Sequence, residues 1–227
     1  MPELPEVETT GRGLSARALG KKLAKVEVRV SKLRLPIPPQ LARALVGQTL
    51  EAVTRRAKYL LLGFSGGHTL LLHLGMSGRL VFAEGRNQAK RHLAKHDHII
   101  LHFAGLDPVI FNDPRRFGLL ALCPTAGLAT HPLLAHLGPE PLQQGFCGRY
   151  LHHTLQGKTT PIKVAILDQT VVVGVGNIYA SEALFRAGVR PQRPAGKLTR
   201  PEADRLAQAI KDVLRAAIKA GGSTLRD

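Results

Sequence analysis

A change of pattern near residue 131 constrains the fold of this chain more than any other feature. Before it, apolar residues alternate with polar ones, as in Val26, Val28 and Val30 around Glu27 and Arg29. Such alternation is typical of half-buried β-strands. Strand-like runs follow over residues 49–55, 59–64, 69–74, 79–82, 98–103, 109–111 and 118–122. Many short strands with few helices predict an antiparallel β-sandwich or barrel.

After the change the pattern is helical. Prolines and glycines over 131–141 predict a linker or hinge. Helices are expected over residues 143–155, 161–168 and 177–188. Thr199 and Glu202 have the spacing of a capping box, which opens a last helix ending at Gly221-Gly222. The residues expected on the buried face of this helix are Leu206, Ile210, Val213, Leu214 and Ile218.

The predicted fold class is therefore α+β with two domains. Residues 1–130 are expected to form an antiparallel β-sandwich flanked by an N-terminal helix, and residues 142–227 an all-helical domain. The linker over 131–141 lies between them.

The N-terminal octapeptide Met1-Pro2-Glu3-Leu4-Pro5-Glu6-Val7-Glu8 is unusually rich in acids and prolines. Pro5 fits the first turn of a helix, and Glu6 lies in the same turn, where the helix dipole favours acids. An initiator methionine is usually removed before proline, so Pro2 is expected to supply a secondary amine beside the Glu3 carboxyl. A rigidly held amine is a covalent nucleophile toward a carbonyl-like carbon. The alternative is an ordinary helix start with acidic residues in its first turn.

The chain is strongly basic. It has 32 Lys and Arg against 16 Asp and Glu, a formal charge of +16 and a pI near 10.6. This balance indicates a polyanionic partner, most often nucleic acid. No polybasic tail favours a membrane surface, and no apolar run approaches the ~18 residues of a spanning helix. Two distant cysteines, Cys123 and Cys147, favour a reducing cytosol, so we expect a cytoplasmic nucleic-acid binder.

Three motifs in the β-rich half carry candidate functional residues, each with a structural alternative. Lys58 follows two arginines and precedes an apolar run. Its functional interpretation is to bind phosphate, and its structural alternative is to protect the edge of a strand. Met76 lies on a glycine-flanked turn. Its functional interpretation is to fill the space that an extruded base leaves in DNA, and its structural alternative is to fill an irregular gap in the core. Arg115 and Phe117 follow Asp113-Pro114. Arginine can hydrogen-bond an unpaired base, and phenylalanine can wedge between stacked bases. The structural alternative is a tight turn from which Phe117 returns to the core.

Two further motifs resemble common ligand sites. His96 and His98 flank Asp97, but two histidines do not make a metal site. The stretch 173–180 resembles a dinucleotide fingerprint and fails it, because Tyr179 stands at the third glycine position. A glycine-rich turn that opens a helix at Asn177 still presents free N–H groups to a phosphate.

Together these segments resemble the formamidopyrimidine-DNA glycosylase family. The resemblance rests on the octapeptide and on the motifs RRAKY at 55–59, HLGMSG at 73–78, KHDH at 95–98, DPRRFG at 113–118 and GVGNIYASE at 174–182. It covers essentially all 227 residues. It implies a helix–two-turns–helix DNA-binding domain and a base-excision repair enzyme with glycosylase and abasic-site lyase activities. Leu4 favours this family over its sister, endonuclease VIII.

The resemblance also implies the site residues. The catalytic set is Pro2 as nucleophile, Glu3 as general acid at the sugar, Lys58 at the phosphodiester, and Glu6. The implied DNA contacts are Met76, His96, Arg115, Phe117, Lys163 and Asn177. Met76, Arg115 and Phe117 would fill the vacated stack, with Arg115 facing the unpaired cytosine, and the others would contact phosphates. Glu182 is expected to cap or buttress the helical unit.

Members of this family continue beyond residues 221–227 into a lesion-recognition loop and a four-cysteine zinc finger. This sequence has no Cys-x-x-Cys pair, so we assign no metal ligand. Either it is a fragment of a longer protein, which we expect, or this form lacks the finger. No redox or nucleotide cofactor is expected. The expected partner is double-stranded DNA with oxidised purines, such as 8-oxoguanine or formamidopyrimidines, or with abasic sites, bound by a monomer.

Three alternatives remain open. An endonuclease VIII-like glycosylase would act on oxidised pyrimidines, and a non-catalytic DNA-binding fragment would need only the basic charge. A glycoside hydrolase would use Glu3 and Glu6 as a carboxylate pair. Zero Trp, three Tyr and the charge of +16 argue against a sugar-binding cleft.

Overall fold

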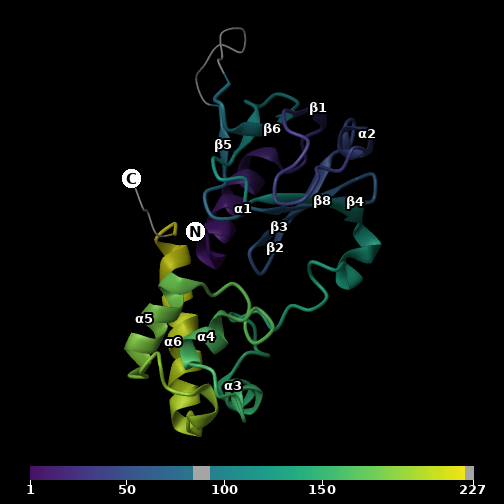
Figure 1. Cartoon of the computed structure of the whole chain (residues 1–227). Coiled ribbons are helices and arrows are strands. Elements are labelled where there is room, and N and C mark those ends of the chain that lie inside the picture. Colours follow the sequence, from purple (N-terminus) through teal and green to yellow (C-terminus); the bar gives the residue numbers. More distant parts are fainter. Residues whose placement is uncertain (84–92, 223–227) are drawn as a thin grey trace. The chain divides into compact units, whose positions relative to one another are not determined.

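A computed structural model describes residues 1–83 and 93–222, which form two compact units (Figure 1). One unit comprises residues 1–2 and 10–131, and the other comprises residues 3–9 and 132–227. Ser223 to Asp227, assigned above to the helical domain, lie outside the described residues. Helix α1 (Leu4–Ala18) contributes residues to both units.

The first unit contains two four-stranded antiparallel sheets, in the strand orders β1-β6-β7-β5 and β2-β3-β4-β8. The strands of the first sheet are β1 (Leu23–Val28), β5 (Arg79–Phe82), β6 (Asp97–Phe103) and β7 (Val109–Asn112). Those of the second are β2 (Leu50–Arg56), β3 (Tyr59–Phe64), β4 (His68–His73) and β8 (Leu119–Pro124). A short helix, α2 (Leu41–Leu45), and a 3₁₀ helix, η2 (Thr125–Thr130), complete it. The predicted antiparallel β-sandwich is confirmed.

Alternation of buried and half-buried residues sets the register of the second sheet. In β3 the buried positions are Leu60, Leu62 and Phe64, as a period of two requires. The neighbouring strand β4 instead buries four consecutive residues, 69–72, as a strand covered on both faces does. Helix α1 packs against the same sheet at β3, because Gly11 brings its backbone close to the Leu60 side chain.

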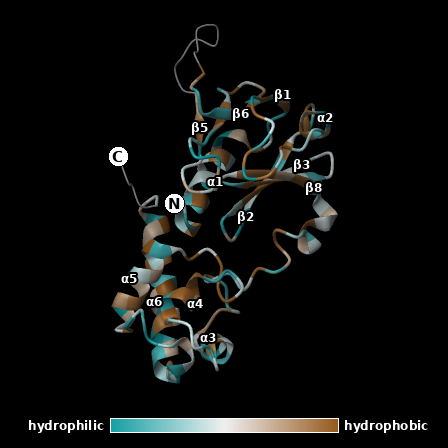
Figure 2. Cartoon of the chain, viewed as in Figure 1, coloured by the Kyte–Doolittle hydropathy of each residue, from teal (hydrophilic) through white to brown (hydrophobic). Residues whose placement is uncertain are grey.

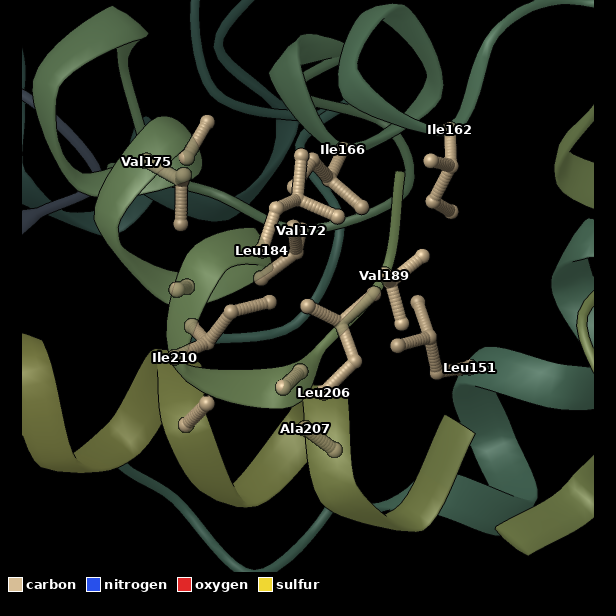
Figure 3. Close-up of a cluster of buried hydrophobic side chains, with 14 of the residues drawn as sticks. Leu151, Ile162, Ile166, Val172, Val175, Leu184, Val189, Leu206, Ala207 and Ile210 are labelled. Atoms are coloured by element: carbon tan, nitrogen blue, oxygen red, sulfur yellow. The ribbon is translucent and has the colours of Figure 1, made fainter. Parts of the chain in front are cut away.

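The second unit is helical, and its core is one apolar cluster (Figure 3). Its helices are α3 (Gly148–Leu155), α4 (Ile162–Leu167), α5 (Asn177–Ala187), η3 (Ala195–Lys197) and α6 (Arg200–Lys219). Polar and apolar residues alternate around the turns of α6, and its apolar side supplies Leu206 and Ile210 to the cluster (Figure 2). The predicted capping box is present: the Glu202 carboxylate accepts the Thr199 N–H at 2.8 Å. Ile218, expected to be buried, is only partly so.

Two boundaries differ from the sequence prediction. The helix expected over 143–155 begins at Gly148, because residues 140–146 form tight turns instead. Gly148 packs against Asp204 so closely that an added Cβ would lie 2.0 Å from its Oδ1. The linker expected over 131–141 is partly packed structure: Gly138 donates its N–H to the Gln169 carbonyl, and Glu140 is buried. No helix among the described residues is long and apolar enough to cross a membrane.

Candidate active site and nucleic-acid interface

The Glu3 side chain lies at the N-terminus of α5. Its Oε2 accepts the Gly176 N–H at 2.7 Å and its Oε1 accepts the Ile178 N–H at 2.9 Å; a longer bond of 3.4 Å comes from Tyr179 N–H. The first N–H groups of a helix lack partners within it, and the dipole there favours negative charge. Glu3 is 1 % exposed, so these bonds fix its position.

Glycines permit this close approach. A Cβ on Gly176 would lie 2.3 Å from the Glu3 carboxyl carbon, and one on Gly174 would lie 2.6 Å from Leu4. Gly174 has a φ of +79°, in the left-handed region that favours glycine. The Leu4 N–H donates to the Gly174 carbonyl at 3.0 Å, and the Gln169 side chain accepts the Gly174 N–H at 2.8 Å. The glycine-rich turn therefore receives the N-terminus rather than a nucleotide.

Glu6 is bonded on both carboxylate oxygens. Its Oε2 accepts the Glu3 N–H at 2.8 Å, which is half of a capping box at the start of α1. Its Oε1 accepts the Tyr179 hydroxyl at 2.7 Å. This geometry gives Glu6 a positioning role, because it orients the backbone of Glu3. Sequence reasoning missed Tyr179 and Gln169, since neither stands out by type or spacing.

Pro2 is half-buried and precedes Glu3 directly. Its nitrogen is bonded to Met1, which is exposed, so removal of Met1 would leave a secondary amine adjacent to the fixed Glu3. Glu3, the residue that follows Pro2, is held by hydrogen bonds, so the N-terminal end of the chain is fixed at that residue.

In the first unit, Lys58 is the second residue of the two-residue turn that joins β2 to β3, and it is 9 % exposed. The preceding residue, Ala57, has a φ of +54°, and its carbonyl accepts a 2.8 Å bond from Arg55. A non-glycine residue in this region costs about 1 kcal/mol. The hairpin therefore presents Lys58 on a strained, well-defined turn. The alternative of a solvated lysine at a strand edge does not fit this buried side chain.

His73, at the end of β4, lies near Lys58. Burial lowers the pKa of His73 to about 4, and the charges of Lys58 and Arg34 act in the same direction. The His73 Nδ1 accepts the Gly75 N–H at 2.9 Å, which requires the neutral ring with its proton on Nε2. The Tyr59 ring packs against it, with centroids 4.9 Å apart. Sequence reasoning treated His73 only as part of a motif, because the pairing of His73 with Tyr59 across β3 and β4 is what brings it near Lys58.

Met76, Arg115 and Phe117 are all exposed on turns of the first unit. Met76 is 41 % exposed and Phe117 is 45 % exposed, so the core-packing alternative is wrong for both. The Arg115 guanidinium carbon lies 4.9 Å from the centroid of the Phe117 ring. Exposed apolar side chains next to a cation suit insertion into stacked bases.

His96 precedes β6, half-buried, and its ring centroid is 6.2 Å from that of His98. His98 is buried and its Nε2 bonds the Asp113 carbonyl at 2.9 Å. Over residues 1–83 and 93–222 no group of three or more His, Cys, Asp or Glu side chains is placed to hold a metal ion. Cys123 is buried and Cys147 exposed, both as free thiols.

Asn177 is the first residue of α5 and is exposed. Lys163, on α4, is half-buried and lines a cavity of about 460 Å³ with residues from the C-terminal end of α5. Glu182 does not buttress the helical unit as expected: it forms a surface ion pair of 2.5 Å with Arg186, one turn along α5. Asn177 therefore lies at the N-terminal end of α5, whereas Lys163 lies beside its C-terminal end.

Comparison with known proteins agrees with this arrangement. Residues 1–120 match the family model of the formamidopyrimidine-DNA glycosylase N-terminal domain, and residues 137–227 match that of the H2TH domain of the same enzyme. The formamidopyrimidine-DNA glycosylase of Cereibacter sphaeroides is 49 % identical over 231 residues, covering 100 % of this chain and 82 % of the relative. That of Halorhodospira halophila is 51 % identical with the same coverage.

Solved structures agree with the sequence relatives. The crystal structure of the MutM (Fpg) protein from Thermus thermophilus superposes with a TM-score of 0.85 at 40 % identity, covering 100 % of this chain and 79 % of that one. A complex between a Lactococcus lactis Fpg mutant and a Fapy-dG containing DNA superposes with a TM-score of 0.89 at 35 % identity, covering 100 % and 82 %. Both domains and the full length of this chain are matched, and it belongs to the formamidopyrimidine-DNA glycosylase family.

Proposed function

We propose that this chain removes oxidised purines, such as 8-oxoguanine and formamidopyrimidines, from double-stranded DNA and then cleaves the abasic site. The observation that carries the proposal is the Glu3 carboxylate, which is held at 2.7 and 2.9 Å by two N–H groups of the α5 N-terminus directly after Pro2. An ordinary acidic helix start needs no partner more than 170 residues away. Relatives support the substrate class, since solved Lactococcus lactis Fpg complexes contain Fapy-dG or abasic-site DNA.

The proposed chemistry begins at Pro2 after removal of Met1. Its nitrogen attacks the anomeric carbon of the damaged nucleotide, the bond from that carbon to the base breaks, and the base leaves as an anion that takes a proton from water. The Glu3 carboxylate takes the proton that the Pro2 nitrogen loses and delivers it to the sugar ring oxygen as the ring opens. Because the amine is secondary, the product is a cationic iminium, which withdraws electrons from the sugar.

Strand cleavage follows from this iminium by two eliminations. Loss of a proton from the carbon next to the iminium expels the 3′ phosphate, and a second elimination expels the 5′ phosphate. Hydrolysis of the iminium then releases the sugar remnant and restores the Pro2 amine. The reaction needs no redox partner, because its steps are a substitution that expels the base, two eliminations that expel phosphates and a hydrolysis by water.

The other candidate residues would bind the DNA. Lys58 is proposed to hold a phosphate near the reacting sugar, and His96, Lys163 and Asn177 to contact other phosphates. Base extrusion leaves a gap in the stack. We propose that Met76, Arg115 and Phe117 occupy this gap; the exposed fractions of Met76 and Phe117 support that role.

The compartment and oligomeric state are also proposals. Two free thiols, one of them exposed, support a reducing cytosol. One polypeptide carries all the residues named above, which supports a monomer.

A substrate panel tests the proposal. Single-turnover cleavage would be followed on duplexes that contain 8-oxoguanine, a formamidopyrimidine, an oxidised pyrimidine or an abasic site. We expect cleavage of both purine lesions and of the abasic duplex, with phosphates left on both sides of the gap. Preference for the oxidised pyrimidine would instead indicate an endonuclease VIII-like enzyme. Binding without any cleavage would indicate a non-catalytic DNA-binding protein.

A further inference from the structure

Three separate turns of the first unit carry the residues proposed to enter or contact the DNA. Met76 lies between β4 and β5, Arg115 and Phe117 lie between β7 and β8, and His96 lies just before β6. All of them are exposed or half-buried. Exposed turns move independently unless the backbone beneath them is bonded together. Insertion of several side chains into one gap requires such a connection.

Asp113 supplies the connection. It is 0 % exposed, its Oδ1 accepts the Ser77 hydroxyl at 2.7 Å, and its Oδ2 accepts the Gly118 N–H at 2.8 Å. Its own N–H donates to the His96 carbonyl at 3.0 Å, and its carbonyl is bonded by His98 Nε2 at 2.9 Å. One buried residue is therefore bonded to all three turns.

Ser77 extends this network to Arg115. The Ser77 hydroxyl donates to Asp113 and accepts the Arg115 backbone N–H at 3.2 Å. The next residue, Arg116, has a φ of +55°, which lies in the left-handed region. A non-glycine residue stays in this region only where surrounding bonds hold it there. The Arg115 turn thus has a conformation that the Asp113–Ser77 pair stabilises.

Glycines keep the turns in contact. A Cβ on Gly75 would lie 2.4 Å from the Gly118 nitrogen, and one on Gly118 would lie 3.0 Å from Asp113 Oδ2. The Met76 and Phe117 turns therefore pack backbone to backbone, with the Asp113 carboxylate beside the contact. A shift of one turn is transmitted to the other.

A carboxylate matches both donors that this site presents. Ser77 and Gly118 each present a donor, and a carboxylate has an acceptor oxygen for each. An asparagine has a single acceptor oxygen. If that oxygen accepts the Gly118 N–H, the NH₂ group faces the Ser77 hydroxyl, which must then accept instead of donate. Asp113→Asn therefore removes the charge and the Ser77-to-Asp113 bond as it stands, with almost no change in volume.

We infer that Asp113 is a positioning residue: through Ser77 and Gly118 it joins the turns so that Met76, Arg115 and Phe117 enter the duplex as one unit. This inference rests on the proposed function, in which these three side chains fill the vacated stack. It predicts an effect on duplex substrates and on discrimination of the base opposite the lesion. Single-stranded abasic DNA has no opposite base and no stack to fill, so its cleavage does not depend on the insertion of Met76, Arg115 and Phe117.

The test compares Asp113→Asn, Ser77→Ala and the control Asp107→Asn with the wild type. Single-turnover rates would be measured on 8-oxoguanine opposite cytosine, on 8-oxoguanine opposite adenine, and on single-stranded abasic DNA. For Asp113→Asn and Ser77→Ala we expect a loss of about tenfold or more with the cytosine duplex, the size of effect of one lost hydrogen bond to a charged group. The cytosine-to-adenine rate ratio should fall toward one, while the abasic single strand is cleaved at nearly the wild-type rate.

Other outcomes overturn the inference. Equal losses on all three substrates would mean a structural role only, and unchanged ratios in a folded Ser77→Ala protein would mean that the turns do not act together. Ser77→Ala decides the matter alone if Asp113→Asn fails to fold. A wild-type protein that leaves both lesion duplexes intact would instead overturn the proposed function.

Discussion

The Tyr179 hydroxyl donates a 2.7 Å hydrogen bond to Glu6 Oε1. The other oxygen of that carboxylate accepts the backbone N–H of Glu3, so a phenol on α5 determines the orientation of the residue next to Pro2. Tyr179 is 3 % exposed, and Glu6 lies 173 residues before it. The first turn of α1 is therefore part of the helical unit, to which residues 3–9 belong.

Tyr179→Phe tests this relationship. The loss of one hydrogen bond should lower the free energy of unfolding by about 1 kcal/mol. It should also slow lesion cleavage at least severalfold, because Glu3 loses part of its support. Tyr150→Phe is the matched control, since the Tyr150 hydroxyl donates at 3.0 Å to the Val171 carbonyl in the same unit. Denaturant unfolding and single-turnover kinetics should show similar destabilisation in both variants and slower cleavage only in Tyr179→Phe.

Gly176→Ala tests the approach of Glu3 to α5. A Cβ there would lie 2.3 Å from the Glu3 carboxyl carbon, whose oxygens are bonded to backbone N–H groups. The carboxylate must move, so we expect cleavage to fall by at least about tenfold, the change that corresponds to about 1.4 kcal/mol. In Gly145→Ala a Cβ would meet nothing within 4 Å, and activity should be retained. Equal activity in the two variants would contradict the importance of this contact.

Much of this arrangement was predictable from sequence, because strand alternation and helix caps are local signals. The β3 bounds and the start of α5 match the prediction, and Gly188 ends α5 in the left-handed conformation expected of a terminal glycine. The bonds between Glu3 and α5 were not predictable, since they join residues 173 apart. The bonds of Asp113 were not predictable either, because Ser77 is distant from it in the sequence. In the sequence, Asp113 looks like the first residue of an ordinary Asp-Pro turn.

The pKa of His73 is a direct test of the environment near Lys58. It is lowered to about 4, so the unfolded chain binds more protons than the native state between about pH 4 and 6.5. His73 therefore contributes stability that is fully present above about pH 6.5 and is lost as the pH falls toward 4. NMR titration of the ring should give a midpoint near 4. In His73→Asn the free energy of unfolding should depend less on pH in this window; an ordinary midpoint would contradict the burial of the ring.

DNA binding should weaken steeply with salt, because phosphate neutralisation releases counterions. Lys163→Ala should lower affinity similarly for all sequences and reduce the slope of log K against log salt concentration by about one. Lys25→Ala is the control, because the Lys25 ammonium already pairs with Glu27 at 2.9 Å. Fluorescence anisotropy at several salt concentrations gives both slopes. A slope that Lys163→Ala leaves unchanged would remove Lys163 from the interface.

The most direct test of the central claim is borohydride trapping on a duplex that contains 8-oxoguanine opposite cytosine, with an abasic duplex in parallel. The account predicts a covalent adduct on both duplexes when the chain begins at Pro2. The adduct should be absent when an uncleaved residue before Pro2 keeps its nitrogen in a peptide bond. With Glu3→Gln, trapping on the lesion duplex should fall by roughly 10² to 10⁴-fold, the contribution of a general acid. No adduct on either duplex, from a protein that still binds DNA, would contradict the claim that Pro2 is the nucleophile.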